Sequence, residues 1–270
     1  MRRRVAGRLR LRHGILRRAV RRRGRLAALI TRAFLFRAVD YGESDRVVTL
    51  FGRETGKLGA IARAARRSRK RFGAALAPFV LGEAELKERR GDLWQLLRFD
   101  AIRDFPTIAT DVAKLGHASY LTELCRELVP ERAPDSRIFD LYARALELLD
   151  AGPPSLPLLR AYELHLLDAV GLRPMLGACV RCAAAGPAAG FDPAAGMLCE
   201  ACAAAGALAL GEATRQDLLG RQGQSFDEAA ARPIDPEVNA QARRALVAFV
   251  EWHLGRRLKS VEVIAQMSQR

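Results

Sequence analysis

The sequence predicts an α+β protein with more than one domain: a small N-terminal β-barrel or sandwich, then a helical domain with an inserted zinc-binding segment. Short apolar runs separated by glycine-containing turns between residues 29 and 105 favour strands. A helical spacing of apolar residues begins after Pro106, and two Cys-x-x-Cys pairs follow it. Half of the 270 residues are apolar, which suffices for a sizeable core.

The N-terminal part contains five candidate strands. They cover residues 29–39, 46–51, 57–65, 78–88 and 92–102. The sequences DYGESD, GRETG and RRGD between them supply glycine, which favours tight turns. Five strands at roughly 10–15-residue spacing are typical of a small barrel or sandwich. The fifth run fits neither a clean strand period nor a clean helix period, so its assignment is ambiguous.

The next part of the chain shows the period of amphipathic helices. Asp135 is a candidate N-cap for a helix that stops at Gly152, Gly171 closes another, and Asp235 starts the last. The defining apolar positions are Leu121, Leu124, Cys125 and Leu128; Ile138, Leu141, Tyr142, Ala145, Leu148 and Leu149; Leu159, Tyr162, Leu166, Ala169 and Val170; and Ala242, Ala245, Leu246, Phe249, Val250 and Leu254. We expect a helical bundle, with the alanine-rich residues 183–189 and 203–207 as loop or weak helix.

Two cysteine pairs give the most specific signal in the chain. They are Cys179-Val-Arg-Cys182 and Cys199-Glu-Ala-Cys202, separated by 16 residues. Two such knuckles can bring four thiolates into a tetrahedron of ~2.3 Å bonds, the arrangement that Zn²⁺ prefers. Gly190 and Gly196 favour a hairpin between the knuckles. We expect one structural zinc ion, because a site with four cysteine ligands leaves no open position for a substrate.

The net charge of +15 is concentrated at the N-terminus. Residues 1–25 contain 12 arginines and no acid, which leaves +3 for the rest of the chain. This stretch lacks serine and the continuous apolar segment of an export signal. It fits a nucleic-acid-binding arm, a targeting peptide or translation from an upstream start, and we favour a solvated tail or a wrongly assigned start. Repulsion among its charges makes disorder over residues 1–27 the expectation.

A second basic cluster follows the third candidate strand. Its members are Arg63, Arg66, Arg67, Arg69, Lys70 and Arg71, with no acid among them. Such a run is most often a solvated loop, but beside a small barrel it is typical of a groove that binds single strands. Phe72 and Phe79 lie nearby in the sequence, as stacking positions or as core residues. Arg53 and Lys57, on neighbouring turns, are weaker candidates for DNA contacts.

The sequence contains no recognisable catalytic arrangement. The histidines are His13, His117, His165 and His253, and none has a serine or cysteine partner. There is no glycine-rich loop for a nucleotide, and Cys125 on an apolar helix face is expected to be an inert core residue. We therefore expect no enzyme. No window supplies the ~18 uninterrupted apolar residues of a membrane span, and the thiol pairs indicate a reducing, cytoplasmic compartment.

Several stretches match one known family in the same order along the chain. They are Tyr41-Gly42-Glu43-Ser44-Asp45, Thr55-Gly56-Lys57-Leu58, Ala65-Arg66-Arg67, Arg71-Phe72, Pro78-Phe79, Ser119-Tyr120-Leu121-Thr122-Glu123-Leu124, the cysteine pairs with Gly190-Phe191 between them, and Leu258-Lys259-Ser260. Over about residues 29–265 the chain resembles RecO, the family of bacterial recombination mediators.

The resemblance implies an OB-fold barrel at residues 28–106, a helical domain at 107–173 and 207–270, and a zinc-binding segment at 174–206. It implies binding of single- and double-stranded DNA and annealing of strands coated with single-stranded-DNA-binding protein, whose C-terminal tail would dock on the helical domain. With RecR, such a protein would load RecA onto gapped DNA, in the bacterial cytoplasm near the nucleoid. The arginine-rich leader is the one departure from the family pattern.

Two alternatives stay open. A zinc-containing OB-fold protein that binds RNA or the ribosome would use the same basic cluster, because charge alone does not distinguish DNA from RNA. A nuclease or base-excision enzyme built on the helical domain would need a carboxylate or nucleophile arrangement, and the sequence does not show one.

Overall fold

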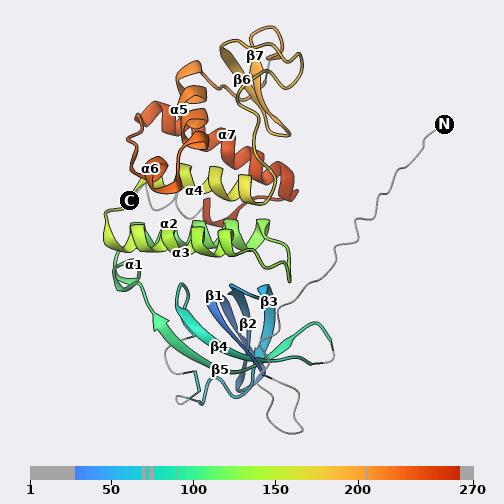
Figure 1. Ribbon diagram of the computed structural model, residues 1–270, viewed down its shortest axis with the longest axis vertical. Helices are drawn as coiled ribbons and strands as arrows, with labels where there is room; N and C mark the ends of the chain where they lie inside the picture. Colours follow the sequence, from blue (N-terminus) through green and yellow to red (C-terminus); the bar gives the residue numbers. More distant parts are fainter. Residues whose placement is uncertain (1–27, 69–70, 73–75, 90, 205, 262–270) are drawn as a thin grey trace, which may run out of the picture.

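The computed structural model describes residues 28–68, 71–72, 76–89, 91–204 and 206–261. The leader at residues 1–27 lies outside the described residues. Figure 1 shows a β-barrel at one end of the molecule, helices α2 and α3 against it, α4 and α7 beyond them, and a two-stranded hairpin at the far end. The α+β class predicted from the sequence is confirmed.

Five strands close into an OB-like barrel. They are β1 (Leu29–Tyr41), β2 (Asp45–Gly52), β3 (Gly56–Ala62), β4 (Leu81–Lys87) and β5 (Trp94–Arg103). The order around the barrel is β1-β2-β3-β5-β4, with β3 and β5 parallel and the other pairs antiparallel. All five predicted strands are present, and the ambiguous fifth run is β5. Its irregular pattern has a physical cause, because two register shifts interrupt its pairing with β4.

Strand β1 is buried on both faces over its middle third. Ala33 and Leu35 point into the barrel core, whereas Phe34 and Phe36 belong to the core shared with the helices. Their rings lie 4.9 and 5.1 Å from the ring of Tyr142 in α3. This double burial explains why the sequence of β1 reads as a continuous apolar run with no strand alternation.

Seven helices make up the rest of the described core. They are α1 (Pro106–Thr110), α2 (Val112–Leu128), α3 (Ser136–Ala151), α4 (Leu156–Ala169), α5 (Glu212–Gly223), α6 (Phe226–Ala231) and α7 (Pro236–Leu254). Asp135 and Asp235 cap α3 and α7 through backbone N–H groups, as predicted. The sequence reasoning missed α1, α5 and α6. Helix α6 has a capping box formed by Ser225 and Glu228, and that Ser-x-x-Glu spacing was the available signal.

The cysteine pairs flank a hairpin of β6 (Ala188–Asp192) and β7 (Gly196–Cys199). The hairpin was predicted from Gly190 and Gly196, but the interpretation of residues 183–189 as loop or weak helix is wrong at its end. Ala188 begins β6, because it pairs with Cys199 and is buried. Pairing to the neighbouring strand and burial therefore override the helix propensity of alanine.

The barrel joins the helices through the turn between β2 and β3. The Arg132 N–H donates to the carbonyl oxygen of Lys57 at 2.8 Å, and Lys57 forms an isolated parallel bridge with Glu131. Gly56 has φ +68°, and a Cβ atom there would lie 2.7 Å from the backbone of Ala133. Only glycine satisfies both the left-handed backbone and this close approach.

The substitution Gly56→Ala should destabilise the protein by about 2–4 kcal/mol, because it adds a backbone clash to a strained φ. Gly42→Ala is the matched control, since Gly42 has φ +59° and open space around its Cβ position. It should cost about 1 kcal/mol, the strain alone. Denaturant unfolding of both variants measures the difference. Equal destabilisation would contradict a tight junction at the β2–β3 turn.

Candidate nucleic-acid interface and metal centre

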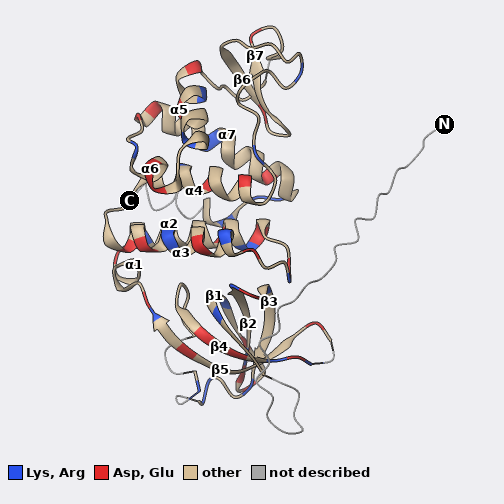
Figure 2. Cartoon of the chain, in the orientation of Figure 1, with Lys and Arg blue, Asp and Glu red and all other residues tan. Residues whose placement is uncertain are grey.

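The basic cluster lies at the end of the barrel that faces away from the helices. Strand β3 begins at Gly56, beside the loop between α2 and α3, and ends at Ala62. Residues 63–68 and 71–72 therefore emerge at the opposite end, where Figure 2 shows blue segments next to the grey stretches. We call the described part of this cluster, Arg63, Arg66, Arg67 and Arg71, the basic turn.

The loop between β1 and β2 supports the basic turn. The Asp45 carboxylate accepts a hydrogen bond from the Ala64 N–H at 2.7 Å. The Arg66 N–H donates to the carbonyl of Ser44 at 3.0 Å, and its guanidinium donates to the carbonyl of Glu43 at 3.2 Å. The YGESD sequence thus positions the basic turn through backbone carbonyls and the Asp45 carboxylate, and one of these carbonyls also binds the Arg66 guanidinium.

The chain returns to the barrel at Phe72. Its side chain is 1% exposed in the barrel core, and the Arg71 guanidinium lies 5.1 Å from the ring centroid. Arg71 also donates to the carbonyl of Arg63 at 2.9 Å. Phe72 is therefore a core residue, and Phe79 packs against the core shared with the helices. The core therefore buries the Phe72 ring and partly covers the Phe79 ring.

The basic turn keeps an excess of positive charge. Arg63, Arg66 and Arg67 are exposed, and Arg66 lies 3.6 Å from the carboxylate of Asp40. Asp40 also pairs with Arg46 at 2.9 Å, so one acid serves two guanidinium groups. Exposed pairs of this kind contribute little stability, and a phosphate can replace the carboxylate. The predicted site residues Arg69 and Lys70 lie outside the described residues.

Arg53 and Lys57 lie at the other end of the barrel. The Arg53 guanidinium donates to both carboxylate oxygens of Asp140 in α3. Lys57 Nζ donates to the carbonyl of Arg126 in α2. Desolvation by burial lowers the pKa of Lys57. The structure does not bring these two residues together with the basic turn. Their turn positions were predictable, but the helices that they contact were not.

The four predicted metal ligands come together. The sulfur atoms of Cys179, Cys182, Cys199 and Cys202 all lie within 4.8 Å of one another. A tetrahedral ion with ~2.3 Å bonds to sulfur requires sulfur–sulfur edges of about 3.8 Å. Cys182 and Cys199 are already 3.6 Å apart. The cluster therefore has the donor set and spacing to hold a metal ion.

Electrostatics within the cluster favour a cation. Backbone hydrogen bonds from Cys199 and Cys182 lower the pKa of Cys179 to about 6, which favours its thiolate. Side-chain hydrogen bonds with Cys182 and Cys199 raise the pKa of Cys202 to about 12. Without a counter-charge, thiolates this close together repel each other, so they cannot all ionise. A metal ion removes this conflict because it binds the deprotonated form.

The remaining titratable groups have structural roles. His117, His165 and His253 each place Nδ1 within 2.8 Å of a backbone carbonyl one helical turn earlier. Burial raises the pKa of Cys125 to about 12, which keeps this thiol protonated and inert. His13 lies outside the described residues. The contacts of the three described histidines are thus made within their own helices.

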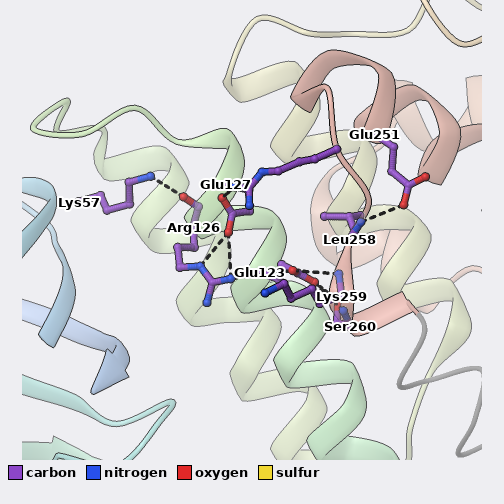
Figure 3. A network of polar contacts seen from close by, with 9 residues as sticks. Lys57, Glu123, Arg126, Glu127, Glu251, Leu258, Lys259 and Ser260 are labelled. Carbon is purple, nitrogen blue, oxygen red and sulfur yellow. Dashed lines mark hydrogen bonds and ion pairs between the residues drawn. The ribbon is translucent and has the colours of Figure 1, made fainter. Parts of the chain in front are cut away.

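Helix α2 links the barrel to the C-terminal segment (Figure 3). Lys57 contacts the carbonyl of Arg126, and the guanidinium of Arg126 lies 2.9 Å from the carboxylate of Glu127. Glu127 in turn pairs with Arg256 beyond α7. One turn of α2 thus touches the barrel on one side and the C-terminal segment on the other.

The Glu123 carboxylate binds the start of the helical segment that begins at Lys259. This buried carboxylate accepts the backbone N–H groups of Lys259 at 3.1 Å and Ser260 at 2.7 Å, and also the Ser260 hydroxyl. Unpaired N–H groups at a helix start favour an anion there. Leu258 is buried beside this contact. Residues 256–261 are therefore fixed against α2, and Val261 is brought to a cavity on the helical domain.

That cavity was not identified from the sequence. Its volume is about 250 Å³, and we call it the arginine pocket. It is lined by His117, Tyr120, Leu156, Leu159, Arg160, Asn239, Arg243 and Val261. Arg160 is buried and pairs with Glu163 at 2.8 Å, but its Nε and Nη1 atoms have no hydrogen-bond partner among the described residues. No periodicity marked this pocket, because its lining comes from α2, α4, α7 and the C-terminal segment.

A larger cavity of about 420 Å³ lies between α3, α4 and α6. Its arginines are already neutralised. Arg144 makes a bidentate ion pair with Asp227 at 3.0 Å, and Arg137 pairs with Asp135 at 2.7 Å. An anionic ligand therefore finds fewer unpaired cations in this cavity than in the arginine pocket.

Comparison with known proteins identifies the family. The chain matches the family models "Recombination protein O N terminal" over residues 26–105 and "Recombination protein O C terminal" over residues 109–262. The chain belongs to the RecO family. DNA repair protein RecO of Anaeromyxobacter sp. (strain K) is 46% identical over 230 residues, 83% of this chain and 91% of that protein.

Two further relatives carry the same name. DNA repair protein RecO of Myxococcus xanthus (strain DK1622) is 40% identical over 87% of this chain and 96% of its own length, and that of Geobacter sulfurreducens is 38% identical over 87% and 97%. RecO proteins are non-catalytic recombination mediators, which confirms the expectation that the chain is not an enzyme. Across the described residues, no helix combines the length and apolarity needed to cross a membrane.

Proposed function

We propose that this RecO chain binds DNA through the basic turn, anneals complementary single strands and acts with RecR to help load RecA onto coated single-stranded DNA. The observation that carries the proposal is a set of exposed arginines at the free end of an OB-like barrel, of which Arg63 and Arg67 have guanidinium groups without a hydrogen bond or ion pair to a described residue. A phosphodiester chain supplies the missing negative charge and releases its condensed counterions.

Annealing follows from contacts made to backbones. Guanidinium groups that bind phosphates carry no sequence information, so the protein accepts any two complementary strands. The base edges stay free to pair, and the local concentration of both strands rises near the positive surface. Nothing in this route needs nucleotide hydrolysis, in keeping with a non-catalytic family.

We assign one Zn²⁺ to the four cysteines, as a structural ion. A site with four thiolate ligands is coordinatively full, so its role is to fix the β6–β7 hairpin. Phe191 and Met197 of that hairpin are buried in the helical core, so the ion supports the packing of the domain. Reduced thiols of this kind fit a reducing compartment, and we place the protein in the bacterial cytoplasm.

Protein purified without chelator should contain one zinc ion per chain. Removing the ion should raise hydrogen exchange over residues 174–206, because metal binding and local folding are coupled, and leave β1–β5 protected. Elemental analysis and exchange mass spectrometry measure the two effects. Cys182→Ser should lose the ion, whereas the control Cys125→Ala should keep it. A wild-type chain without zinc would contradict the assignment.

Replacing Arg63 and Arg67 by alanine should weaken single-strand binding and reduce its salt dependence by about 0.7 in log-log slope for each arginine that binds a phosphate. Neither guanidinium has a hydrogen bond or ion pair to a described residue, so the fold should be retained. The matched control replaces Arg137 and Arg173, which pair with Asp135 and Asp168. Fluorescence anisotropy over a salt series measures the slopes.

The same two double variants belong in an annealing assay. Complementary strands precoated with single-stranded-DNA-binding protein should anneal with the wild-type chain and the control, without any nucleotide, and more slowly with the basic-turn variant. Unchanged affinity and unchanged slope in the Arg63 and Arg67 variant would exclude the basic turn as the DNA site.

We further propose that the acidic, apolar C-terminal tail of single-stranded-DNA-binding protein docks in the arginine pocket. Leu156 is 47% exposed there and offers apolar contact, and Arg243 on the pocket wall can pair with a carboxylate. The arginines of the larger cavity already have acid partners. Docking at this site would bring the protein to coated strands.

Arg243→Ala should weaken binding of a peptide with this tail chemistry about tenfold or more, because it removes a charge-assisted contact. Arg137→Ala, at the larger cavity, is the control and should bind as the wild type does. Fluorescence anisotropy of the labelled peptide measures both. Loss of binding in the Arg137 variant alone would move the site to the larger cavity.

A further inference from the structure

The outer face of β1, β2 and β3 is only half covered by the helices. Near the junction, Phe34, Phe36 and Phe51 lie under α3, with the Phe34 and Phe51 rings 5.2 and 5.7 Å from that of Phe139. The register of β1 shifts between Leu35 and Arg37, so the residues beyond the bulge resume the strand alternation. From there to the free end of the barrel, no described helix packs on this face (Figure 1).

This uncovered half carries a strip of apolar side chains. We call it the open strip: Val39, Tyr41, Val47, Ile61 and Leu93. Val39 pairs with Val47 and Val47 pairs with Ile61, so the three side chains follow one another across neighbouring strands. A Cβ atom on Gly59 would lie 2.8 Å from Leu93 Cδ2, which places the Leu93 side chain on the same face.

The open strip is unusually accessible for apolar residues. Tyr41 is 60% exposed, Val39 42% and Leu93 40%. A contiguous apolar surface of this kind on a barrel exterior indicates a binding surface, since single exposed residues would not line up across strands. The ring of Tyr41 lies at its outer end, where β1 enters the loop to β2.

The open strip borders the basic turn. Arg66 contacts the loop after Tyr41 through the carbonyls of Glu43 and Ser44, and its guanidinium lies 3.6 Å from the carboxylate of Asp40, the residue before Tyr41 in β1. Cations and apolar surface therefore meet at the free end of the barrel. The complementary ligand has regular negative charge on one side and flat apolar faces on the other. An unpaired nucleic-acid strand has both, whereas a duplex hides its base faces in the stack.

We propose that the unpaired bases of a single strand lie on the open strip, with Tyr41 stacking on one of them, while the basic turn holds the adjoining phosphates. This assignment rests on the proposed function. It replaces the aromatic position that the sequence suggested at Phe72, which the barrel core buries. Stacking engages the face of a base and leaves its pairing edge free, which is what annealing requires.

Tyr41→Ala in the full-length chain should weaken binding of oligothymidylate about 5- to 150-fold, the range for one stacked base. The slope of affinity against salt should stay as in the wild type, because no charge is removed. Tyr41→Phe should restore the affinity. Ile30→Ala is the matched control, since Ile30 is 53% exposed on the same strand but pairs with Glu85 of β4 at the other end.

A strand of equal length with abasic positions separates stacking from charge. Wild-type protein should bind it more weakly than oligothymidylate, and Tyr41→Ala should bind the two equally. If Tyr41→Ala binds oligothymidylate as tightly as the wild type, or loses as much affinity for the abasic strand, stacking at Tyr41 is wrong. That result would leave the basic turn intact as the DNA site. Absence of salt-dependent binding to either strand by the wild type would instead overturn the proposed function.

Discussion

The packing of Phe34 and Phe36 against α3 decides how the rest of the molecule is used. These rings turn outward from β1, so they tie the barrel to the helices through apolar burial and edge-to-face ring contacts. The helices cover one half of the outer face of β1, β2 and β3 at this contact. The other half stays exposed. The close approach of Gly56 to Ala133 and the Arg53–Asp140 pair lie at the same junction. Everything proposed for DNA therefore lies at the opposite end.

The two predicted sites follow one electrostatic principle. The basic turn concentrates guanidinium groups, and the cysteine cluster concentrates thiols that bind as thiolates. In each case the protein holds like charges close together, and we propose that an external partner of opposite charge completes the site. The proposed partner of the cysteines is a single ion. The proposed partner of the arginines is a polymer, and its affinity would then depend on salt. The supporting atoms differ accordingly: Asp45 and backbone carbonyls hold the basic turn from behind, whereas backbone N–H groups stabilise the Cys179 thiolate.

Helix α2 connects the barrel with the arginine pocket. Its last turns touch Lys57 of the barrel, and the carboxylates of Glu123 and Glu127 hold the segment that brings Val261 to the pocket wall (Figure 3). Buried or half-buried contacts of this kind make the helical domain and the barrel one packed unit. A strand bound at the free end of the barrel and a protein tail bound on the helices would then sit at fixed positions relative to each other.

The sequence by itself determined the five strands, the capped helices α3 and α7, and the four metal ligands, because these depend on local spacing, turn residues and cap chemistry. It also located the arginines, since charge is read directly. Tertiary structure alone decided their surroundings. The sequence predicted Lys57 and Arg53 as weaker DNA contacts, yet both side chains bind groups of the helices. It left Phe72 open as a stacking or a core residue, and the barrel core buries it. The sequence did not mark Tyr41 as a stacking residue, because its exposure depends on which half of the sheet face the helices cover. It did not mark Arg160 either, because the pocket around this residue is built from elements that are distant in the chain.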